Sequence, residues 1–287
     1  MQTTRVAAVA YLNSLPLIRG LQKTGRHPGI TLQLAPPHDC ARLLREGLVD
    51  VALIPSIEFA RIGGLSAIPG TGVSSRHEVR SVILVSRRPF ASIRSLAADL
   101  NSRTSIALSR LLLSRRHQCR PVVEPMEPDL DRMLEDHDAA LLIGDAALHA
   151  FPAAGAPARE GLLVMDLARE WNEMTGLPFV FAFWACRPVV PWLPMQRLLE
   201  ESLETGLAEL PQIVEEESAR TGLPASLLRR YLAENIRFRL GPGESESLRL
   251  FYRMCREEGI LDHGQGWLRM DQVRAVPAST SEILKSG

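Results

Sequence analysis

The sequence predicts an α/β protein of two lobes with a ligand cleft between them, and three observations support this fold class. Strand and helix signals alternate from the N-terminus in the βαβαβα order that forms a parallel sheet with right-handed crossovers. A second α/β unit follows, and two apolar runs, residues 81–86 and 179–186, bracket it. If both runs cross between lobes, the second unit is an insertion. We therefore expect a discontinuous large lobe (1–87 plus 186–287, with C-terminal helices) and a small inserted lobe (88–185), each a mostly parallel sheet flanked by helices.

The first unit shows the alternation clearly. Short apolar runs bounded by turn residues predict buried strands, and segments with one apolar face, such as that of Cys40, Leu43 and Leu44, predict helices. The predicted elements are strand 5–10, helix 15–22, strand 30–34, helix 38–47, strand 51–54 and helix 56–62. Gly and Pro residues between 63 and 72 then predict a loop.

The second unit repeats the pattern with longer helices. Its predicted elements are strand 81–86, helix 104–116, strand 121–123, helix 130–135, strand 139–143, strand 162–165, helix 166–175 and strand 179–185. Asp166 is the expected N-cap of the helix that it begins. Helices over 195–217, 224–234 and 244–258 follow, with prolines near their ends. After Gly259 the pattern weakens, and we expect a short terminal element and a frayed end from about Thr280.

Composition narrows the classes of function. The 287 residues carry a formal net charge of +0, so no global field favours nucleic acid or an anionic membrane as a partner. No apolar run reaches the roughly 18 residues of a membrane span, and the N-terminus lacks the features of a secretory signal. The four cysteines form no Cys-x-x-Cys pair and the histidines are scattered, so no metal site is predicted. These features predict a cytoplasmic protein.

The junctions between strands and helices carry the first candidate site residues. Asn13 and Ser14 follow the first strand, and Pro16 suits the first turn of the next helix. Neutral hydrogen-bonding groups at a helix N-terminus suit a carboxylate or a hydroxyl, although either residue could simply cap the helix. Ser56 lies at a second junction of this kind, after Pro55. The two junctions can face one ligand if their strands are parallel neighbours.

A hydroxyl-rich segment in the second unit offers a matching feature. Ser102, Thr104 and Ser105 surround the start of an amphipathic helix, where backbone N–H and hydroxyl groups can bind an anion. Capping of the helix is the structural alternative for these residues. Arg103 could instead be a solvated surface residue.

Two further segments contain candidate binding residues. Gly144 ends a strand, where it either lets the backbone approach a ligand or makes a turn. Asp145 suits a helix cap or a hydroxyl acceptor better than a general base. Thr175 precedes Gly176, a natural helix terminator, so a structural role suffices for Thr175, although it could face the cleft. No dinucleotide fingerprint, phosphate loop or nucleophile elbow is present in the sequence.

Five motifs in order resemble the chorismate dehydratase family of the futalosine route to menaquinone. They are Tyr11–Leu17, Asp50–Ser56, Val79–Leu84, Ser102–Ser105 and Trp171–Trp184, and the resemblance spans roughly residues 5–260. The resemblance implies a type II periplasmic-binding-protein-like fold. It also implies loss of water from chorismate to give 3-[(1-carboxyvinyl)oxy]benzoate, with no metal or organic cofactor.

The chemistry of that substrate suggests roles for the candidate residues. Chorismate carries two carboxylates, and the motifs supply mostly neutral donors, which suit carboxylate binding better than strong base catalysis. Our hypothesis is that the side-chain carboxylate of the substrate takes the C3 proton. Asn13 and Ser81 are the expected catalytic residues, orienting this carboxylate and the leaving hydroxyl. Thr104 and Ser105 are expected to hold a carboxylate at the helix N-terminus.

Alternatives remain open at this point. The charged segment Arg76–Glu78 stands where many relatives have a glycine-containing turn, so the loop beside Ser81 is in doubt and His77 or Glu78 could enter the cleft. The rival functions are 1,4-dihydroxy-6-naphthoate synthase of the same pathway, a non-catalytic carboxylate-binding protein, and an effector domain of a regulator. The last lacks support because no helix-turn-helix precedes the first strand. The sequence leaves monomer and homodimer equally open.

Overall fold

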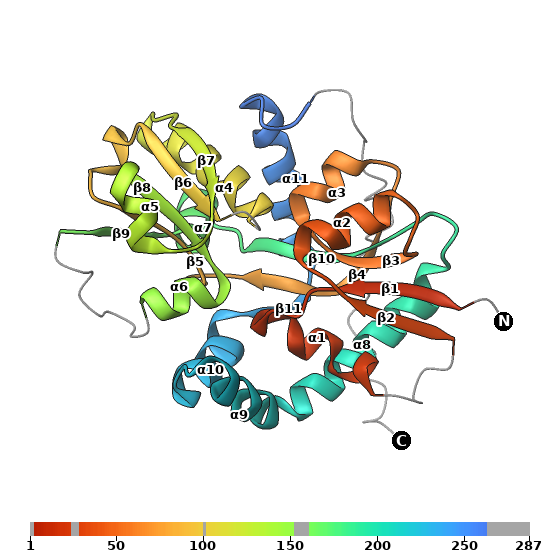
Figure 1. Cartoon of the computed structure of the whole chain (residues 1–287). Coiled ribbons are helices and arrows are strands. Elements are labelled where there is room, and N and C mark those ends of the chain that lie inside the picture. The colour runs from red at the N-terminus through yellow and green to blue at the C-terminus, as the bar shows by residue number, and fades with distance from the viewer. Residues whose placement is uncertain (1–2, 24–28, 100–101, 152–160, 263–287) are drawn as a thin grey trace, which may run out of the picture.

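Two β-sheets with helices on their faces lie side by side in the structure (Figure 1). This computed structural model describes residues 3–23, 29–99, 102–151 and 161–262. The frayed end expected from about Thr280 lies outside these residues. The predicted α/β fold is confirmed. Both sheets are mixed, however, rather than mostly parallel, because in each sheet an antiparallel strand joins the parallel βα units.

The first sheet has six strands in the order β11-β4-β10-β3-β1-β2. Its strands are β1 (Thr4–Ala8), β2 (Ile30–Leu34), β3 (Val51–Pro55), β4 (Ser66–Ser75), β10 (Phe179–Cys186) and β11 (Arg237–Leu240). The first strand pairs in parallel with both β2 and β3, as the βαβαβα pattern predicts. The strand β10 pairs antiparallel with both β3 and β4. The junctions after β1 and β3 therefore do lie at the same edge of one sheet.

The second sheet has five strands in the order β7-β6-β8-β5-β9. Its strands are β5 (Val82–Ser86), β6 (Ser95–Asp99), β7 (Val122–Met126), β8 (Ala139–Ile143) and β9 (Leu163–Asp166). Hydrogen bonds place β5 wholly in this sheet and β10 wholly in the first sheet. The sheets therefore change over before β5 and before β10. The division of the chain into two lobes with bounds at residues 87 and 185 stays a prediction.

Helices pack on both sheets and form the C-terminal region. They are η1 (Leu12–Ser14), α1 (Leu15–Gln22), α2 (Pro37–Arg45), α3 (Ser56–Ile62), η2 (Phe90–Ser92), α4 (Arg103–His117), α5 (Leu130–Asp136), α6 (Gly144–Ala150), α7 (Leu167–Thr175), α8 (Trp192–Ala208), α9 (Leu210–Thr221), α10 (Ala225–Arg230), η3 (Tyr231–Asn235) and α11 (Pro242–Glu257). Asp166 caps α7 as expected, accepting hydrogen bonds from the backbone N–H groups of Ala168 and Arg169.

Several elements differ from the sequence prediction. The strands β4, β6 and β11 and the helix α6 were not predicted. The glycines of β4 predict a loop rather than a strand. In the structure, a Cβ on Gly72 would lie 2.6 Å from the Ala182 carbonyl oxygen, so glycine allows β4 and β10 to approach closely. The predicted helix 195–217 is two helices that meet at Glu209, because Pro211 cannot continue the hydrogen-bond ladder of α8.

Helix α1, which begins beside the first junction, packs tightly against α8. Two glycines make this possible, since a Cβ on Gly20 would lie 2.5 Å from Ser202 Cα and one on Gly206 would lie 2.0 Å from the Pro16 carbonyl oxygen. The Ser202 hydroxyl donates to the Leu17 carbonyl oxygen and accepts from the Leu21 N–H. Close packing of this kind fixes the position of α1 on the sheet.

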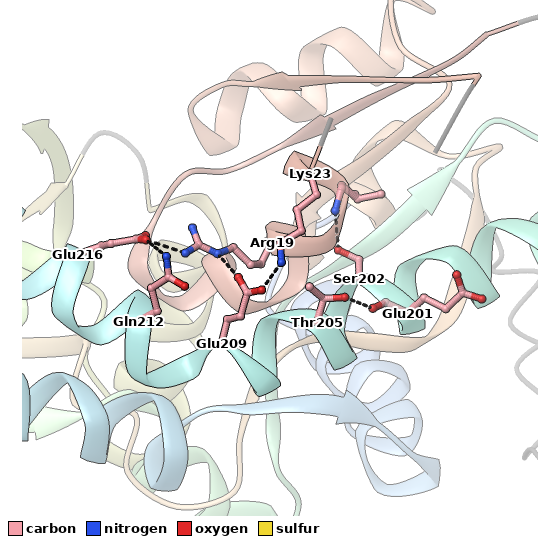
Figure 2. Close-up of polar contacts among 9 residues, drawn as sticks. Arg19, Lys23, Glu201, Ser202, Thr205, Glu209, Gln212 and Glu216 are labelled. Carbon is pink, nitrogen blue, oxygen red and sulfur yellow. Dashed lines mark hydrogen bonds and ion pairs between the residues drawn. The ribbon is translucent and has the colours of Figure 1, made fainter. Parts of the chain in front are cut away.

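A charged network reinforces the same interface (Figure 2). Glu209 binds both Arg19 and Lys23 of the α1 segment, and Arg19 also reaches Glu216 at 2.7 Å. The hydrogen bonds from Lys23 and then Arg19 lower the pKa of Glu209 from its ordinary value of 4.5. A depressed carboxyl pKa means that the ionised group stabilises the fold above its ordinary pKa, and that this stabilisation is lost as the pH falls through the lowered pKa.

Replacing Glu209 with glutamine is therefore expected to lower the melting temperature at neutral pH, with a deficit that disappears at acid pH below the lowered pKa. Thermal unfolding followed by circular dichroism across this range measures the effect. Glu201→Gln on α8 is the control, since Glu201 enters the contacts of Figure 2 through its backbone carbonyl, which accepts from Thr205. A deficit that is independent of pH would contradict the electrostatic explanation.

Within the part of the chain that the structure describes, no helix has the length and apolar character needed to cross a membrane.

Candidate active site between the two sheets

A cavity lies where the two sheets face each other, with about 650 Å³ of empty space that includes the solvent at its open mouth. Its walls come from the ends of strands and the starts of helices in both sheets. The first sheet contributes Asn13 and Pro55, and the second contributes Ser81, Thr104 and Gly144. Helix starts expose unpaired N–H groups, so this arrangement favours an anionic or hydroxylated ligand.

Most of the predicted site residues come together here. The cavity is lined by seven of them: Asn13, Ser14, Ser81, Ser102, Thr104, Ser105 and Gly144. Ser56, Asp145 and Thr175 are not in the lining. Because the first seven come from four separate segments of the chain, their convergence depends on the tertiary structure.

The remaining three predicted residues have structural partners. Ser56 is fully buried and donates its hydroxyl hydrogen to the Val180 carbonyl oxygen at 2.8 Å. Asp145 forms an ion pair with Arg220 at 2.9 Å. Thr175 donates to the Trp171 carbonyl oxygen one turn back in α7. The structure thus places these side chains in contacts that stabilise helices and interfaces rather than on the cavity wall.

A hydrogen-bonded group forms one side of the cavity. The Ser14 hydroxyl donates to Asn13 Oδ1 at 3.3 Å. Tyr231, from the C-terminal region, donates its hydroxyl hydrogen to Ser81 Oγ at 2.7 Å. One of the two expected catalytic residues, Ser81, is therefore held by a tyrosine. Sequence reasoning missed Tyr231 because nothing in its local pattern distinguishes it from a core residue.

The N-terminus of α4 forms the opposite side. No side chain caps this 15-residue helix, and Thr104 and Ser105 in its first turn line the cavity, so the unpaired N–H groups of that turn are available to a ligand there. The Thr104 hydroxyl oxygen accepts from the Ile57 N–H at 3.3 Å, which leaves its hydrogen available. Ser102 differs, since its hydroxyl hydrogen is committed to the Asp99 carbonyl oxygen at 2.7 Å. Ser102 can thus accept from a ligand but not donate to it.

Two charged or titratable residues modify the cavity. Arg103 lines it with a half-exposed guanidinium 3.6 Å from Glu58, a buried carboxylate that also pairs with Arg61. The solvated alternative for Arg103 is therefore only partly right. Tyr11 also lines the cavity, and burial, with smaller effects of Asp99 and other charges, raises its pKa to about 12. Its hydroxyl stays protonated at neutral pH.

The backbone that carries Ser81 is held by the half-buried carboxylate of Asp166. Asp166 accepts from the N–H groups of Val79 at 3.1 Å and Arg80 at 2.6 Å, besides capping α7. Arg80 has φ of 63°, a left-handed conformation that is costly for a residue with a side chain. The segment 76–78 does not line the cavity, and Glu78 pairs with Arg169.

Residues that could hold a metal are not grouped in the described ranges: no cluster of three His, Cys, Asp or Glu side chains occurs there. A reaction without a cofactor stays a prediction.

Solved structures share this architecture. The periplasmic aliphatic sulphonate binding protein of Escherichia coli superposes with a TM-score of 0.63 at 16% identity, over 91% of this chain and 89% of that chain. Identity at this level supports the fold alone, and the fold is that of periplasmic binding proteins.

Sequence comparison is more specific. A chorismate dehydratase of Thermus thermophilus is 33% identical over 84% of this chain and 91% of its own length. A chorismate dehydratase of Campylobacter jejuni is 26% identical over 86% of this chain and 96% of its own length. A family model described as menaquinone biosynthesis matches residues 4–257, which include every side chain of the cavity. With that match over nearly all of the described chain, the protein belongs to the menaquinone biosynthesis family.

Proposed function

We propose that the protein is a chorismate dehydratase, an enzyme that removes water from chorismate to give 3-[(1-carboxyvinyl)oxy]benzoate. The observation that carries the proposal is a cavity lined by neutral donors between two lobes, in a chain 33% identical to a chorismate dehydratase over most of its length. The activity is that of a hydro-lyase in menaquinone biosynthesis. It requires no redox change, because the substrate and the product differ by one water molecule.

The elimination follows from the structure of the substrate. The C3–H bond of chorismate is conjugated through a ring double bond to the ring carboxylate, so loss of this proton gives a delocalised enolate. Expulsion of the C4 hydroxyl with a proton then forms water and an aromatic ring. Aromatisation makes the overall step favourable. The enzyme has to bind two carboxylates, stabilise the enolate and guide one proton.

The cavity offers a group for each of these tasks. We assign one carboxylate to the N-terminus of α4, where Thr104 and Ser105 add hydroxyl donors to the backbone N–H groups. We assign Asn13 and Ser81 to the reacting side, where they orient the substrate's side-chain carboxylate and the leaving hydroxyl. That carboxylate takes the C3 proton in this proposal. Ser14 supports Asn13 through its hydrogen bond to Oδ1.

The deciding experiment incubates the purified protein with chorismate and analyses the products by chromatography and mass spectrometry. Loss of one water to an aromatic product supports the proposal. Unchanged chorismate with a folded protein would favour the naphthoate synthase or a non-catalytic binding protein instead. Asp145→Asn tests the source of the base: turnover should persist, and its loss with binding intact would make Asp145 the general base.

Arg103 gives a prediction about substrate charge. Replacing it with glutamine removes the positive charge from the cavity wall, so the KM for dianionic chorismate is expected to rise about fivefold, with a smaller effect at high salt. Steady-state kinetics at two salt concentrations measure this. Arg110→Gln, an exposed arginine farther along α4, is the matched control. An equal increase in both variants would contradict a specific role for Arg103.

A cytoplasmic location is part of the proposal. The four cysteines are buried free thiols, as expected for a reducing compartment. A sedimentation measurement distinguishes a monomer from a homodimer.

A further inference from the structure

Tyr231 reaches the cavity wall from the opposite end of the chain. It lies 150 residues from Ser81, begins the π-helix η3, and is buried with 1% of its surface exposed. Its hydroxyl donates to Ser81 Oγ at 2.7 Å. Tyr231 does not line the cavity itself, so it cannot touch a ligand there, but it can determine how Ser81 does.

The direction of this hydrogen bond follows from the donors available. A phenol has one hydrogen, and Tyr231 directs it at Ser81. Since Ser81 Oγ accepts from the tyrosine, its own hydrogen is left to point at an acceptor in the cavity.

The π-helix holds Tyr231 at this place. A π-helix inserts an extra residue in a turn, a costly feature that occurs often at functional sites. The last residue of η3, Asn235, donates from Nδ2 to the Glu78 carbonyl oxygen at 3.1 Å. The element η3 thus contacts the segment that precedes Ser81 as well as Ser81 itself. Burial raises the pKa of the Tyr231 hydroxyl, so it remains a donor at neutral pH.

We propose that Tyr231 is a positioning residue for the dehydration, which aims the Ser81 hydroxyl at the substrate through its hydrogen bond to Ser81 Oγ. This inference rests on the proposed function. A hydroxyl that accepts a hydrogen bond is polarised into a stronger donor, and the Ser81 hydroxyl is the one that meets the substrate.

The test replaces one buried tyrosine hydroxyl at a time. Tyr231→Phe keeps the ring and removes the donor, so kcat is expected to fall about 10- to 100-fold while KM changes little. Tyr252→Phe is the matched control: Tyr252 is equally buried and donates at 2.7 Å to the Ser56 carbonyl oxygen, and kcat should be retained. Each variant is assayed well below its own melting temperature, so that partial unfolding does not contribute.

A double-mutant cycle separates positioning from a structural effect. If Tyr231 acts through Ser81, adding Tyr231→Phe to Ser81→Ala should lower the residual rate no further. Full additivity, or an unchanged kcat in Tyr231→Phe while the wild type is active, would overturn the positioning role alone. A wild-type protein that leaves chorismate unchanged would overturn the proposed function and this inference together.

Discussion

Replacing Asn13 with alanine is expected to lower kcat about 10²- to 10³-fold, the loss typical when one preorganised donor to a reacting group is removed. Asn13 lines the cavity and accepts a hydrogen bond from Ser14. Its removal leaves the substrate carboxylate unoriented. Steady-state kinetics with chorismate measure the effect.

Asn172→Ala provides the control for the Asn13 variant. Asn172 lies on α7, outside the cavity lining, and its amide donates to the Leu177 carbonyl oxygen at 3.2 Å. Both variants lose a local hydrogen bond, with an expected cost of about 1 kcal/mol of stability. Only Asn13→Ala should lose turnover. Equal kcat values for the two variants would remove Asn13 from the proposed catalytic pair.

Replacing Gly206 with alanine is expected to lower the free energy of unfolding by about 2 kcal/mol. Alanine favours a helix over glycine by up to about 1 kcal/mol, so local propensity alone predicts the opposite sign. The added Cβ, however, would lie 2.0 Å from the Pro16 carbonyl oxygen, a backbone atom that can move only with α1. Overpacking of this kind costs about 1–3 kcal/mol or more and outweighs the gain.

The displacement of α1 that the added Cβ on residue 206 would cause also has a functional consequence. The helix α1 follows directly from η1, which carries Asn13 and Ser14, so a shift of α1 away from α8 should also reduce kcat. Chemical denaturation and kinetics test the two effects together. Gly243→Ala is the control, because that glycine is also helical and its Cβ would only touch Pro178 at 3.8 Å. A stability equal to that of the control would show that α1 and α8 can separate without cost.

Local sequence patterns predicted much of the fold. The helices 15–22 and 56–62 and the strand 30–34 have the predicted bounds, because apolar spacing and proline positions act within a few residues. The strand β4 was missed, because its glycines indicate a loop until β10 is known to lie against them. Whether these glycines belong to a loop or to a strand depends on their contact with β10, which no local pattern encodes.

The candidate site likewise contains residues that the sequence located and residues whose role only the structure shows. Asn13, Thr104 and Gly144 stand at junctions of strands and helices, where parallel βα topology brings ligand-binding groups to one edge, and the sequence alone located them. Ser56 has the same local signature but turns inward to the Val180 carbonyl oxygen, a partner 124 residues away. Only the tertiary structure could distinguish Ser56 from the residues that line the cavity, since the difference lies in which distant segment packs against each junction.

What the sequence by itself determined is therefore the class of fold, the family resemblance and seven of the residues that line the cavity, all of which depend on short-range order. The tertiary structure alone decided that Tyr231 donates to Ser81 and that glycines allow α1 to pack closely on α8. The physical reason is that a buried hydrogen bond or a close backbone contact joins segments far apart in the chain. Such contacts exist only once the core has brought those segments together.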